Sequence, residues 1–336
     1  MPITIRELAE KLNLSITTVS RALDGYRDVA EETRQRVVQE AKEMGYEPSY
    51  AARQLRRKRT DAIGYILPTN APQFSDPFYS DFLAGLCDET AQQQYDLTIS
   101  SCPPDSEQEE SQYHRWVQSQ RVDGLVLNRV RLQDWRIDYL RQNSFPFVSL
   151  ESSNAGVDYP HVHVEDGLAI QQLVLHLAGK GHRRIAFIGA SSDLVIQHSR
   201  WQGYCAGLQQ AGLPYDPLLD GRSDLSEAGG RQTARQYLHQ DEPPTAIVCI
   251  NDLTALGALQ AATENNLQVG KDLAISGYNG IKETQLTSPP LTTIRQPTYE
   301  IGRQLTDMLL KTLNGQELPT QQVTIRPQLM LRASTG

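Results

Sequence analysis

Short apolar segments alternate with amphipathic ones along most of this chain. The segments with strand character lie at 62–67, 95–100, 122–127, 145–150, 161–164, 184–189, 245–250 and 273–278. Segments with helical character separate most of them. Strand–helix alternation of this kind builds parallel sheets with helices on both faces. Residues 61–336 are too many for one comfortable sheet, and residues 62–66 and 184–189 open two similar halves. The pattern therefore predicts two α/β subdomains.

The first sixty residues follow a different pattern, which predicts three short helices. Thr4 and Glu7 form a capping-box pair before a helix over 5–12. Asn13 tolerates the left-handed backbone of a tight corner. Two further helices are expected over 16–23 and 31–44. They are marked by a capping Ser15 before the first and by Gly45 after the second.

A trihelical unit with a four-residue corner is typical of the helix-turn-helix. In that geometry the second helix enters the major groove of DNA, and its first turn faces the base edges. Ile16 and Thr17 occupy that turn, and Arg21 follows one turn later. Arg bonds guanine bidentately, whereas Thr and Ile contact the thymine methyl. A trihelical bundle that binds another protein is the alternative.

Residues 49–60 predict a helix that forms only with a partner. Ser49 can cap it, but about two turns are too few to persist alone in water. Leu55 is its only large aliphatic side chain. In a linker such a residue means little, whereas in a minor groove it is a wedge that opens a base step.

Charge separates the beginning of the chain from the rest. Residues 1–60 hold 12 Lys+Arg and 9 Asp+Glu, a net of +3, and the remainder carries 20 against 31, a net of −11. The densest basic stretch contains Arg53, Arg56, Arg57, Lys58 and Arg59. A basic beginning on an acidic body indicates that only the first part meets a polyanion. A solvated linker has a similar composition.

Polar side chains follow several strands of the predicted sheets, where ligands of such folds bind. These candidates are Asn251, Asp252, Asn279, Arg200 in a following helix, and the aromatic pair Phe78 and Tyr79. Amide, carboxylate and guanidinium groups bind sugar hydroxyls, and an aromatic ring packs against a pyranose. Each residue also has a structural interpretation. Asn251 or Asp252 can cap a helix, Arg200 can pair with a carboxylate, and Phe78 can be core.

Several function classes are excluded or disfavoured. No nucleophile elbow, phosphate-binding loop or metalloprotease motif is present, and the seven His residues form no ligand series. Cys87, Cys102, Cys205 and Cys249 are far apart and are predicted to be small buried thiols. No apolar run is long enough to span a bilayer, and the first residues do not resemble a secretory signal. We therefore expect a cytoplasmic protein that is not an enzyme and has no catalytic residue, cofactor or metal.

A series of motifs that runs from IRELAEKLNLSITTVSRALDG at the start to PPLTTIRQP near the end resembles the LacI/GalR repressors along essentially the whole chain. IRELAEKLNLSITTVSRALDG and VAEETRQRVVQEAKEMGYEPSYAARQL are similar to the DNA-binding part of that family. In the body, the similar motifs are DGLVL, KGHRRIAFIG, RWQGYCAGL, AIVCINDLTALGAL, LAISGYNG and PPLTTIRQP, in the family's order.

This resemblance implies an all-α helix-turn-helix head on a two-lobed, periplasmic-binding-protein-like α/β body. The head is expected at 1–48, a hinge helix at 49–60, and the effector-binding and dimerisation domain at 61–336. Within the body, the N-lobe is expected at about 61–160 plus 291–319, and the C-lobe at about 161–290 plus 320–336.

The resemblance also implies a homodimeric transcriptional regulator that binds a palindromic operator as a repressor. A mono- or disaccharide in the cleft between the lobes would control its affinity. By position, the implied DNA contacts are Ser15, Ile16, Thr17, Arg21, Arg27, Arg53, Leu55 and Arg56. The implied effector contacts are Phe78, Tyr79, Arg200, Asp224, Asn251, Asp252 and Asn279.

Four features bear on that resemblance. Asn13 replaces the family's usual corner Gly, and Asn279 stands where many members carry Asp. Asp224 falls about where several members place an aromatic residue. After PQLMLRAS no Leu-heptad tail is visible, so a dimer is expected rather than a tetramer. Alternatives remain open: a regulator with a non-sugar effector such as a nucleobase, a transport solute-binding protein, and a sugar-modifying enzyme.

Overall fold

A computed structural model describes residues 3–23, 25–26, 28–46, 59–69, 76–153, 158–190 and 193–336. Two compact units make up the chain, Met1–Thr60 and Asp61–Gly336. Most of the predicted hinge helix lies outside the described residues. The predicted DNA contacts Arg27, Arg53, Leu55 and Arg56 lie outside them as well.

Among its described residues, the N-terminal unit contains three helices at the bounds that the sequence predicts. They are α1 (Ile5–Leu12), α2 (Ile16–Leu23) and α3 (Glu31–Met44). One side chain of each helix is fully buried in a common core, Leu8 of α1, Val19 of α2 and Val37 of α3. Because each helix contributes one apolar stripe, the opposite faces stay in contact with solvent.

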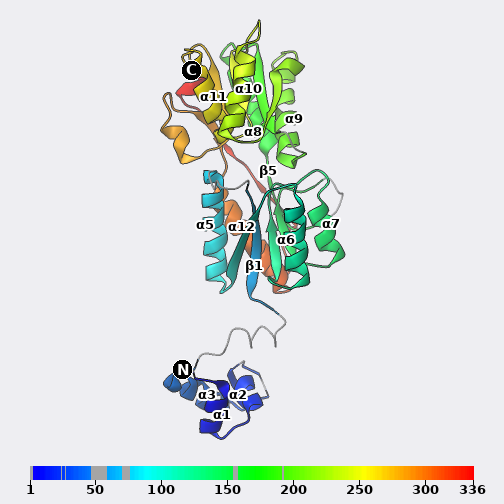
Figure 1. Cartoon of the computed structure of the whole chain (residues 1–336), viewed down its shortest axis with the longest axis vertical. Coiled ribbons are helices and arrows are strands. Elements are labelled where there is room, and N and C mark those ends of the chain that lie inside the picture. The colour runs from blue at the N-terminus through cyan, green and yellow to red at the C-terminus, as the bar shows by residue number, and fades with distance from the viewer. Residues whose placement is uncertain are drawn as a thin grey trace. The chain divides into compact units, whose positions relative to one another are not determined.

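The second unit has two lobes, each built on its own six-stranded sheet (Figure 1). The N-lobe sheet has the order β11-β5-β4-β3-β1-β2, and its neighbouring strands are all parallel. Its strands are β1 (Ala62–Pro68), β2 (Asp96–Cys102), β3 (Gly124–Leu127), β4 (Phe147–Leu150), β5 (His161–Val164) and β11 (Gln322–Ile325). Its helices are α5 (Pro77–Gln92), α6 (Glu107–Gln118), α7 (Trp135–Gln142) and α12 (Thr298–Leu313).

Strand β1 shows why this sheet is covered on both faces. Ile63, Tyr65 and Leu67 pack with side chains of α5 and α12. Ala62 and Ile66 alternate with them and pack with side chains of α6 and α7 on the other face. A strand buried on both faces reads as a continuous apolar run, as this one does.

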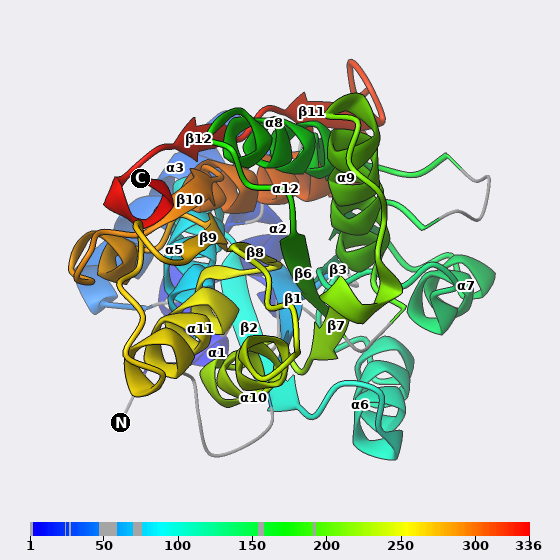
Figure 2. The same ribbon diagram turned by 90° about the horizontal axis from the view of Figure 1, so that it is seen from above.

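The C-lobe sheet has the order β12-β10-β9-β8-β6-β7, and only β12 runs antiparallel to its neighbour. Its strands are β6 (Ile185–Ala190), β7 (Asp220–Ser223), β8 (Ala246–Cys249), β9 (Ala274–Asn279), β10 (Thr292–Arg295) and β12 (Gln328–Met330). Helices α8 (Asp166–Gly179) and α9 (Val195–Gln210) cover one face, and α10 (Glu227–Leu238) and α11 (Asp252–Glu264) cover the other (Figure 2). Three short 3₁₀ helices complete the lobe: η1 (Pro217–Leu219), η2 (Lys282–Gln285) and η3 (Ala333–Thr335).

The chain passes between the lobes three times, at positions that correct the predicted lobe limits. Strands β5 and β11 belong to the N-lobe sheet, although 161–164 and 320–325 were expected in the C-lobe. Strand β10 belongs to the C-lobe sheet, although 291–295 was expected in the N-lobe. The crossings therefore follow β5, β10 and β11. For β5 and β11 the cause is long-range, because these two strands pair with each other although they are distant in sequence. Strand β10 pairs with β9, the C-lobe strand that precedes it.

Two further sequence predictions are tested by the described residues. None of the described helices has the length and apolar character needed to span a membrane. All four cysteines are free thiols, but the prediction that all are buried is wrong. Cys102 and Cys249 are buried, Cys205 is partly exposed and Cys87 is exposed on α5.

Candidate DNA-binding and effector-binding sites

The corner between α1 and α2 is formed by the residues that the sequence singles out. Asn13 has φ 54° and ψ 42°, the left-handed conformation that ends α1. At the start of α1, the Thr4 amide donates to the Glu7 carboxylate (2.7 Å), and the Glu7 amide donates to Thr4 Oγ1 (3.4 Å). The hydrogen bonds that the Thr4 amide and hydroxyl donate to the Glu7 carboxylate lower the pKa of Glu7. Ser15 caps α2 by accepting a hydrogen bond from the Thr18 amide (3.0 Å). The helix-turn-helix geometry is thus fixed by local bonds.

Helix α2 presents the predicted base-reading side chains to solvent. Ser15, Ile16 and Thr17 are exposed, and Ile16 retains 43% of its accessible surface. An exposed Ile at the first turn of a short helix gains nothing from the core, which is consistent with a contact surface.

Arg21 is engaged within the protein itself. Its guanidinium forms an ion pair with Asp28 and lies 4.9 Å from the centre of the Tyr26 ring. Both charged side chains are about half-exposed, 43% for Arg21 and 56% for Asp28. Exposed pairs of this kind contribute only about 0–1 kcal/mol, so Arg21 can exchange Asp28 for another acceptor at little cost.

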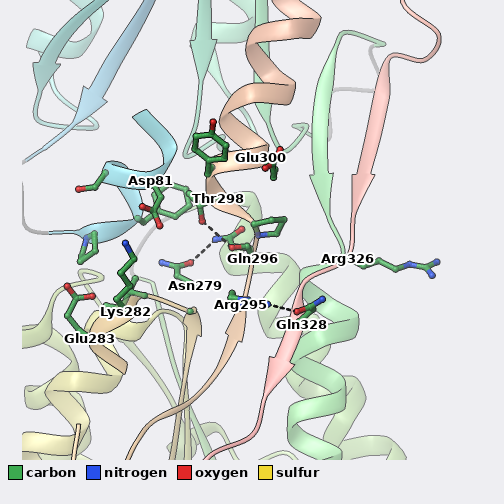
Figure 3. Close-up of a pocket in the computed structure, with 17 residues that line it drawn as sticks. Asp81, Asn279, Lys282, Glu283, Arg295, Gln296, Thr298, Glu300, Arg326 and Gln328 are labelled. Carbon is green, nitrogen blue, oxygen red and sulfur yellow. Dashed lines mark hydrogen bonds between the residues drawn. The ribbon is translucent and has the colours of Figure 1, made fainter. Parts of the chain in front are cut away.

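In the body, a cavity of about 510 Å³ lies between the two lobes (Figure 3). Its N-lobe wall comes from the first turns of α5 and α12, which include Phe78, Asp81 and Thr298. Its C-lobe wall comes from Asn279, the last residue of β9, and from the segment that follows it, which includes Gly280 and Ile281. Asn279 has φ 117°, and its side-chain oxygen accepts a hydrogen bond from Gln296 Nε2 (2.8 Å). Pockets of this size accept small organic ligands.

The aromatic pair at the start of α5 divides into a lining and a supporting residue. Phe78 lines the cavity and stacks on Phe82 at 5.7 Å between ring centres. Tyr79 contacts Phe78 edge-on at 5.3 Å, and burial raises the pKa of its phenol. Asp76 caps the helix by accepting from the Phe78 amide (3.0 Å), and burial raises the pKa of this carboxyl.

Arg200 is buried in the C-lobe and held by three groups. Its Nε donates to Asp166 (3.1 Å), and its Nη1 donates to the Ile250 carbonyl (2.6 Å). Its guanidinium lies 3.5 Å from the centre of the Tyr278 ring, whose hydroxyl also bonds Asp166. Among the described residues no partner bonds Nη2 of Arg200. The group is therefore fixed in place, with both N–H groups of Nη2 unused.

Asn251 and Asp252 use their side chains within the protein. Asn251 caps α11 by accepting from the Thr254 amide (2.9 Å), and its side-chain amide donates to the Leu225 carbonyl (2.9 Å). Asp252 accepts from the amides of Gly280 (2.7 Å) and Ile281 (2.9 Å) and from Thr293 Oγ1 (2.6 Å). Gly280 and Ile281 line the cavity, so Asp252 positions its C-lobe wall.

Asp252 supplies a test of this arrangement by pH. Burial raises the pKa of its carboxyl to about 6, above the ordinary 3.8. The stabilisation from this group is therefore fully present below pH 3.8 and is lost as the pH rises through about 6. We expect the free energy of unfolding, measured in urea, to fall across this window more steeply in wild type than in Asp252→Asn.

The same substitution at the exposed Asp224 is the matched control and should leave the wild-type pH profile unchanged. If the free energy of unfolding of wild type and Asp252→Asn changed with pH in parallel, the raised pKa of the buried Asp252 carboxyl would be contradicted. Asp224 itself accepts hydrogen bonds from the amide (3.1 Å) and hydroxyl (2.5 Å) of Ser226. It is not among the described residues that line the cavity.

Three polar residues at the ends of N-lobe strands were not singled out from the sequence. Asn128 and Arg129 follow β3, and Glu151 follows β4. Arg129 has φ 49°, and its buried Nε has no hydrogen-bond partner in the described part of the chain. Glu151 binds the Val164 amide (2.8 Å) and His163 (2.8 Å). Their position directly after predicted strands, the rule that selected Asn251, was a signal that would have found them.

Burial raises the pKa of Glu151, and the bond to Glu151 raises the pKa of His163. No cluster of three or more His, Cys, Asp or Glu suited to a metal ion occurs in the part of the chain that the structure describes.

Comparison with known proteins identifies both units. Residues 4–49 match the family described as bacterial regulatory proteins, lacI family. Residues 174–335 match the periplasmic binding protein-like domain. The HTH-type transcriptional regulator AglR of Rhizobium meliloti (strain 1021) is 34% identical over 341 residues, which cover 100% of this chain and 95% of that protein. The repressor CytR of Escherichia coli (strain K12) is 34% identical over 333 residues, covering 99% and 96%.

Solved structures agree with these relatives. The lac repressor dimer bound to operator and the anti-inducer ONPF has a TM-score of 0.84 at 27% identity, covering 100% of this chain and 99% of that chain. The complex of the transcriptional regulator CelR with cellobiose has a TM-score of 0.77 at 26% identity, covering 99% of each. Together with the helix-turn-helix head and the two-lobed body, these matches show that the chain belongs to the lacI family of bacterial DNA-binding transcriptional regulators.

Proposed function

We propose that this protein is a cytoplasmic repressor that binds a palindromic operator as a homodimer. We further propose that its affinity for the operator rises or falls when a sugar occupies the cleft of the body. One observation carries the proposal: the same chain combines an exposed recognition helix, α2, with a cavity of about 510 Å³ between two lobes. The relatives reported above are named as regulators, and their names support a regulatory rather than a catalytic role.

On the DNA side, Ile16, Thr17 and Arg21 are proposed to read base edges in the major groove. Ser15 caps the helix that carries them and contacts the backbone of the DNA. Arg27, Arg53, Leu55 and Arg56 are proposed to complete the interface, with Leu55 as a minor-groove wedge.

Arg21→Ala should weaken operator binding by about 1–3 kcal/mol and relax specificity at one base position. The measurement is fluorescence anisotropy with an operator selected from random DNA by the wild-type protein, and with its single-base variants. Arg36→Ala is the charge-matched control, since Arg36 is exposed on α3. If Arg21→Ala lowers affinity equally for all sequences, Arg21 contacts the DNA backbone instead.

On the effector side, Phe78 offers a ring face and Asn279 an amide within the cavity. Arg200 and Asn251 stand at the C-terminal edge of the neighbouring strands, and Asp252 braces the wall. Tyr79 supports Phe78, and Asp224 lies at the start of α10. A ring face with several hydrogen-bonding groups suits a mono- or disaccharide.

The coupling between the two sites follows from the three chain crossings. A ligand that contacts both lobes favours one arrangement of them over the other, because its affinity for the two arrangements differs. That arrangement sets the spacing of the two heads in the dimer. Couplings of this type are typically about 1–3 kcal/mol, or about 5–150-fold in affinity.

A gel shift with the selected operator, with and without a panel of sugars, tests the proposal. A sugar that changes the shifted fraction supports it. A change with nucleobases alone would retain the regulator and replace the effector class.

A further inference from the structure

A second cavity, of about 500 Å³, opens at the edge of the C-lobe, and the proposed effector contacts do not use it. Its walls are formed mainly by C-lobe side chains, with Leu132 contributed by the N-lobe. The C-lobe residues are Asp193, Gln197, His198, Trp201 and Arg222. An aromatic ring, a guanidinium, a carboxylate and an amide share this opening.

Helix α9 places this second cavity next to the buried Arg200. Gln197 stands three residues before Arg200 and four before Trp201, so its side chain neighbours both on the helix surface. Gln197 is 8% exposed, and its side-chain oxygen accepts a hydrogen bond from the Ala190 amide (2.6 Å). Its side-chain nitrogen has no hydrogen-bond partner among the described residues. The side-chain nitrogen of Gln197 is therefore an unused donor beside both Arg200 and Trp201 on α9.

The N-lobe closes over the same opening. The Leu132 amide donates to the Asp193 carbonyl (2.9 Å), and the Val195 amide donates to the Val130 carbonyl (2.9 Å). These are direct backbone bonds between the loop after β3 and the residues where α9 begins. A ligand held here would touch both lobes, as the coupling mechanism requires.

The Trp201 ring is held in a fixed orientation. Its Nε1 donates to Asp220 Oδ2 (2.8 Å), and the Tyr215 hydroxyl donates to the same oxygen (2.8 Å). Tyr215 contacts the indole edge-on, at 6.3 Å between ring centres and 89° between planes. Arg222 forms an ion pair with Asp220 and lines the cavity. A ring that is already ordered loses little entropy when a flat ligand stacks on it.

We propose that this second cavity is a sugar subsite in which one pyranose ring stacks on Trp201 and bonds Gln197 and Arg222, while a linked ring occupies the cleft beside Arg200. The effector is then a disaccharide or longer rather than a monosaccharide. This inference rests on the proposed sugar-responsive function and narrows it. Asp193 and His198 are exposed at the rim, where they are available to further hydroxyl groups.

The test is isothermal titration of the full-length protein with matched sugars: glucose and galactose against maltose, cellobiose, trehalose, lactose and melibiose. We expect at least one disaccharide to bind ten times more tightly than either monosaccharide, or about 1.4 kcal/mol. Trp201→Ala should reduce that advantage to twofold or less. Trp201→Phe, which keeps an aromatic face, should retain most of it.

Two controls separate stacking from folding. Trp201 packs against the C-lobe core, so the thermal unfolding midpoint of each variant is measured. If Trp201→Ala is unfolded, the sugar affinities of Trp201→Phe are used to test the subsite instead. Gln202→Ala changes the exposed neighbour of Trp201 on the same helix and should bind every sugar like wild type.

Tryptophan fluorescence gives a second readout, because Trp201 is one of three tryptophans and lines this cavity. The preferred disaccharide should shift the emission of wild type, and Trp201→Phe should lose that shift while still binding the sugar.

Other outcomes overturn the inference. A monosaccharide that binds as tightly as every disaccharide, or a disaccharide preference that survives Trp201→Ala, removes the subsite. If a nucleoside binds tightly and no sugar binds, the ligand of this cavity is a nucleoside rather than a sugar. If sugars fail but the operator is still bound specifically, only the sugar assignment falls. If a disaccharide binds through Trp201 but no operator is recognised, the subsite stands and the proposed function fails.

Discussion

Arg200→Ala is expected to abolish the effect of sugar on operator affinity while leaving operator binding without sugar intact. Arg200 is 3% exposed, and its pairing with Asp166 is equally buried. Removing one partner of a buried ion pair leaves an uncompensated charge, which costs about 3–5 kcal/mol. We therefore also expect the free energy of unfolding of the body to fall by that amount. Urea unfolding and operator anisotropy with and without the effector measure the two effects.

Arg235→Ala is the matched control for this variant. Arg235 forms an exposed pair with Glu264 on the same lobe, and such pairs contribute only about 0–1 kcal/mol. The control should respond to sugar like wild type. A normal response in Arg200→Ala would place the effector elsewhere, and unchanged stability would show that Asp166 is not left unpaired.

Arg136→Ala is the second variant with a large expected effect. Arg136 is 3% exposed and bonds Asp134 through Nε (2.9 Å) and Nη2 (2.6 Å). Burial alone would raise the pKa of Asp134, but its bonds to Arg136 lower it. Loss of this partner should destabilise the N-lobe by about 3–5 kcal/mol.

The Arg136→Ala substitution should also weaken effector binding, through the loop that Arg136 supports rather than through a contact with the effector. Arg136 also donates to the carbonyls of Asn128 (3.2 Å) and Arg129 (3.0 Å), so it fixes the loop after β3 that bonds the C-lobe. Urea unfolding and sugar titration measure both consequences. Arg141→Ala, an exposed arginine on the same helix α7, is the control. Wild-type sugar affinity in a folded Arg136→Ala protein would show that this loop does not shape the site.

The head could be predicted closely because its signals are local. Thr4 with Glu7, Asn13, Ser15 and Gly45 each act within one turn of the helix end that they define. In the body, strands buried on both faces, such as β1 and β8, were visible as apolar runs. The strands that were missed, β7, β10, β11 and β12, are short, and three of them are partly exposed, so polar residues interrupt their pattern.

The lobe limits were displaced because strand partners are not written in local sequence. Nothing near residues 322–325 shows that this segment pairs with β5, more than a hundred residues earlier in the chain. The error is small in residues but bears on the proposed coupling, which depends on the chain crossings between the lobes.

The site residues show the same limit. The rule that ligands bind at strand ends brought Asn251, Asp252 and Asn279 to one edge of the C-lobe sheet. The rule could not show that both carboxylate oxygens of Asp252 accept hydrogen bonds within the protein, because the donors Gly280 and Thr293 are distant in sequence. Trp201 was hidden for a related reason: its importance depends on Asp220 and Tyr215, which only the fold brings to it.

The most direct measurement is the dissociation constant of the full-length protein for its selected operator and for random DNA of equal length, at physiological ionic strength, with and without the preferred sugar. We predict specific binding that is about 10³-fold or more tighter than binding to random DNA. We also predict a change of about 5–150-fold in operator affinity when the sugar is added. Equal affinity for both DNAs, whichever sugar is present, would contradict the proposed sugar-responsive DNA binding.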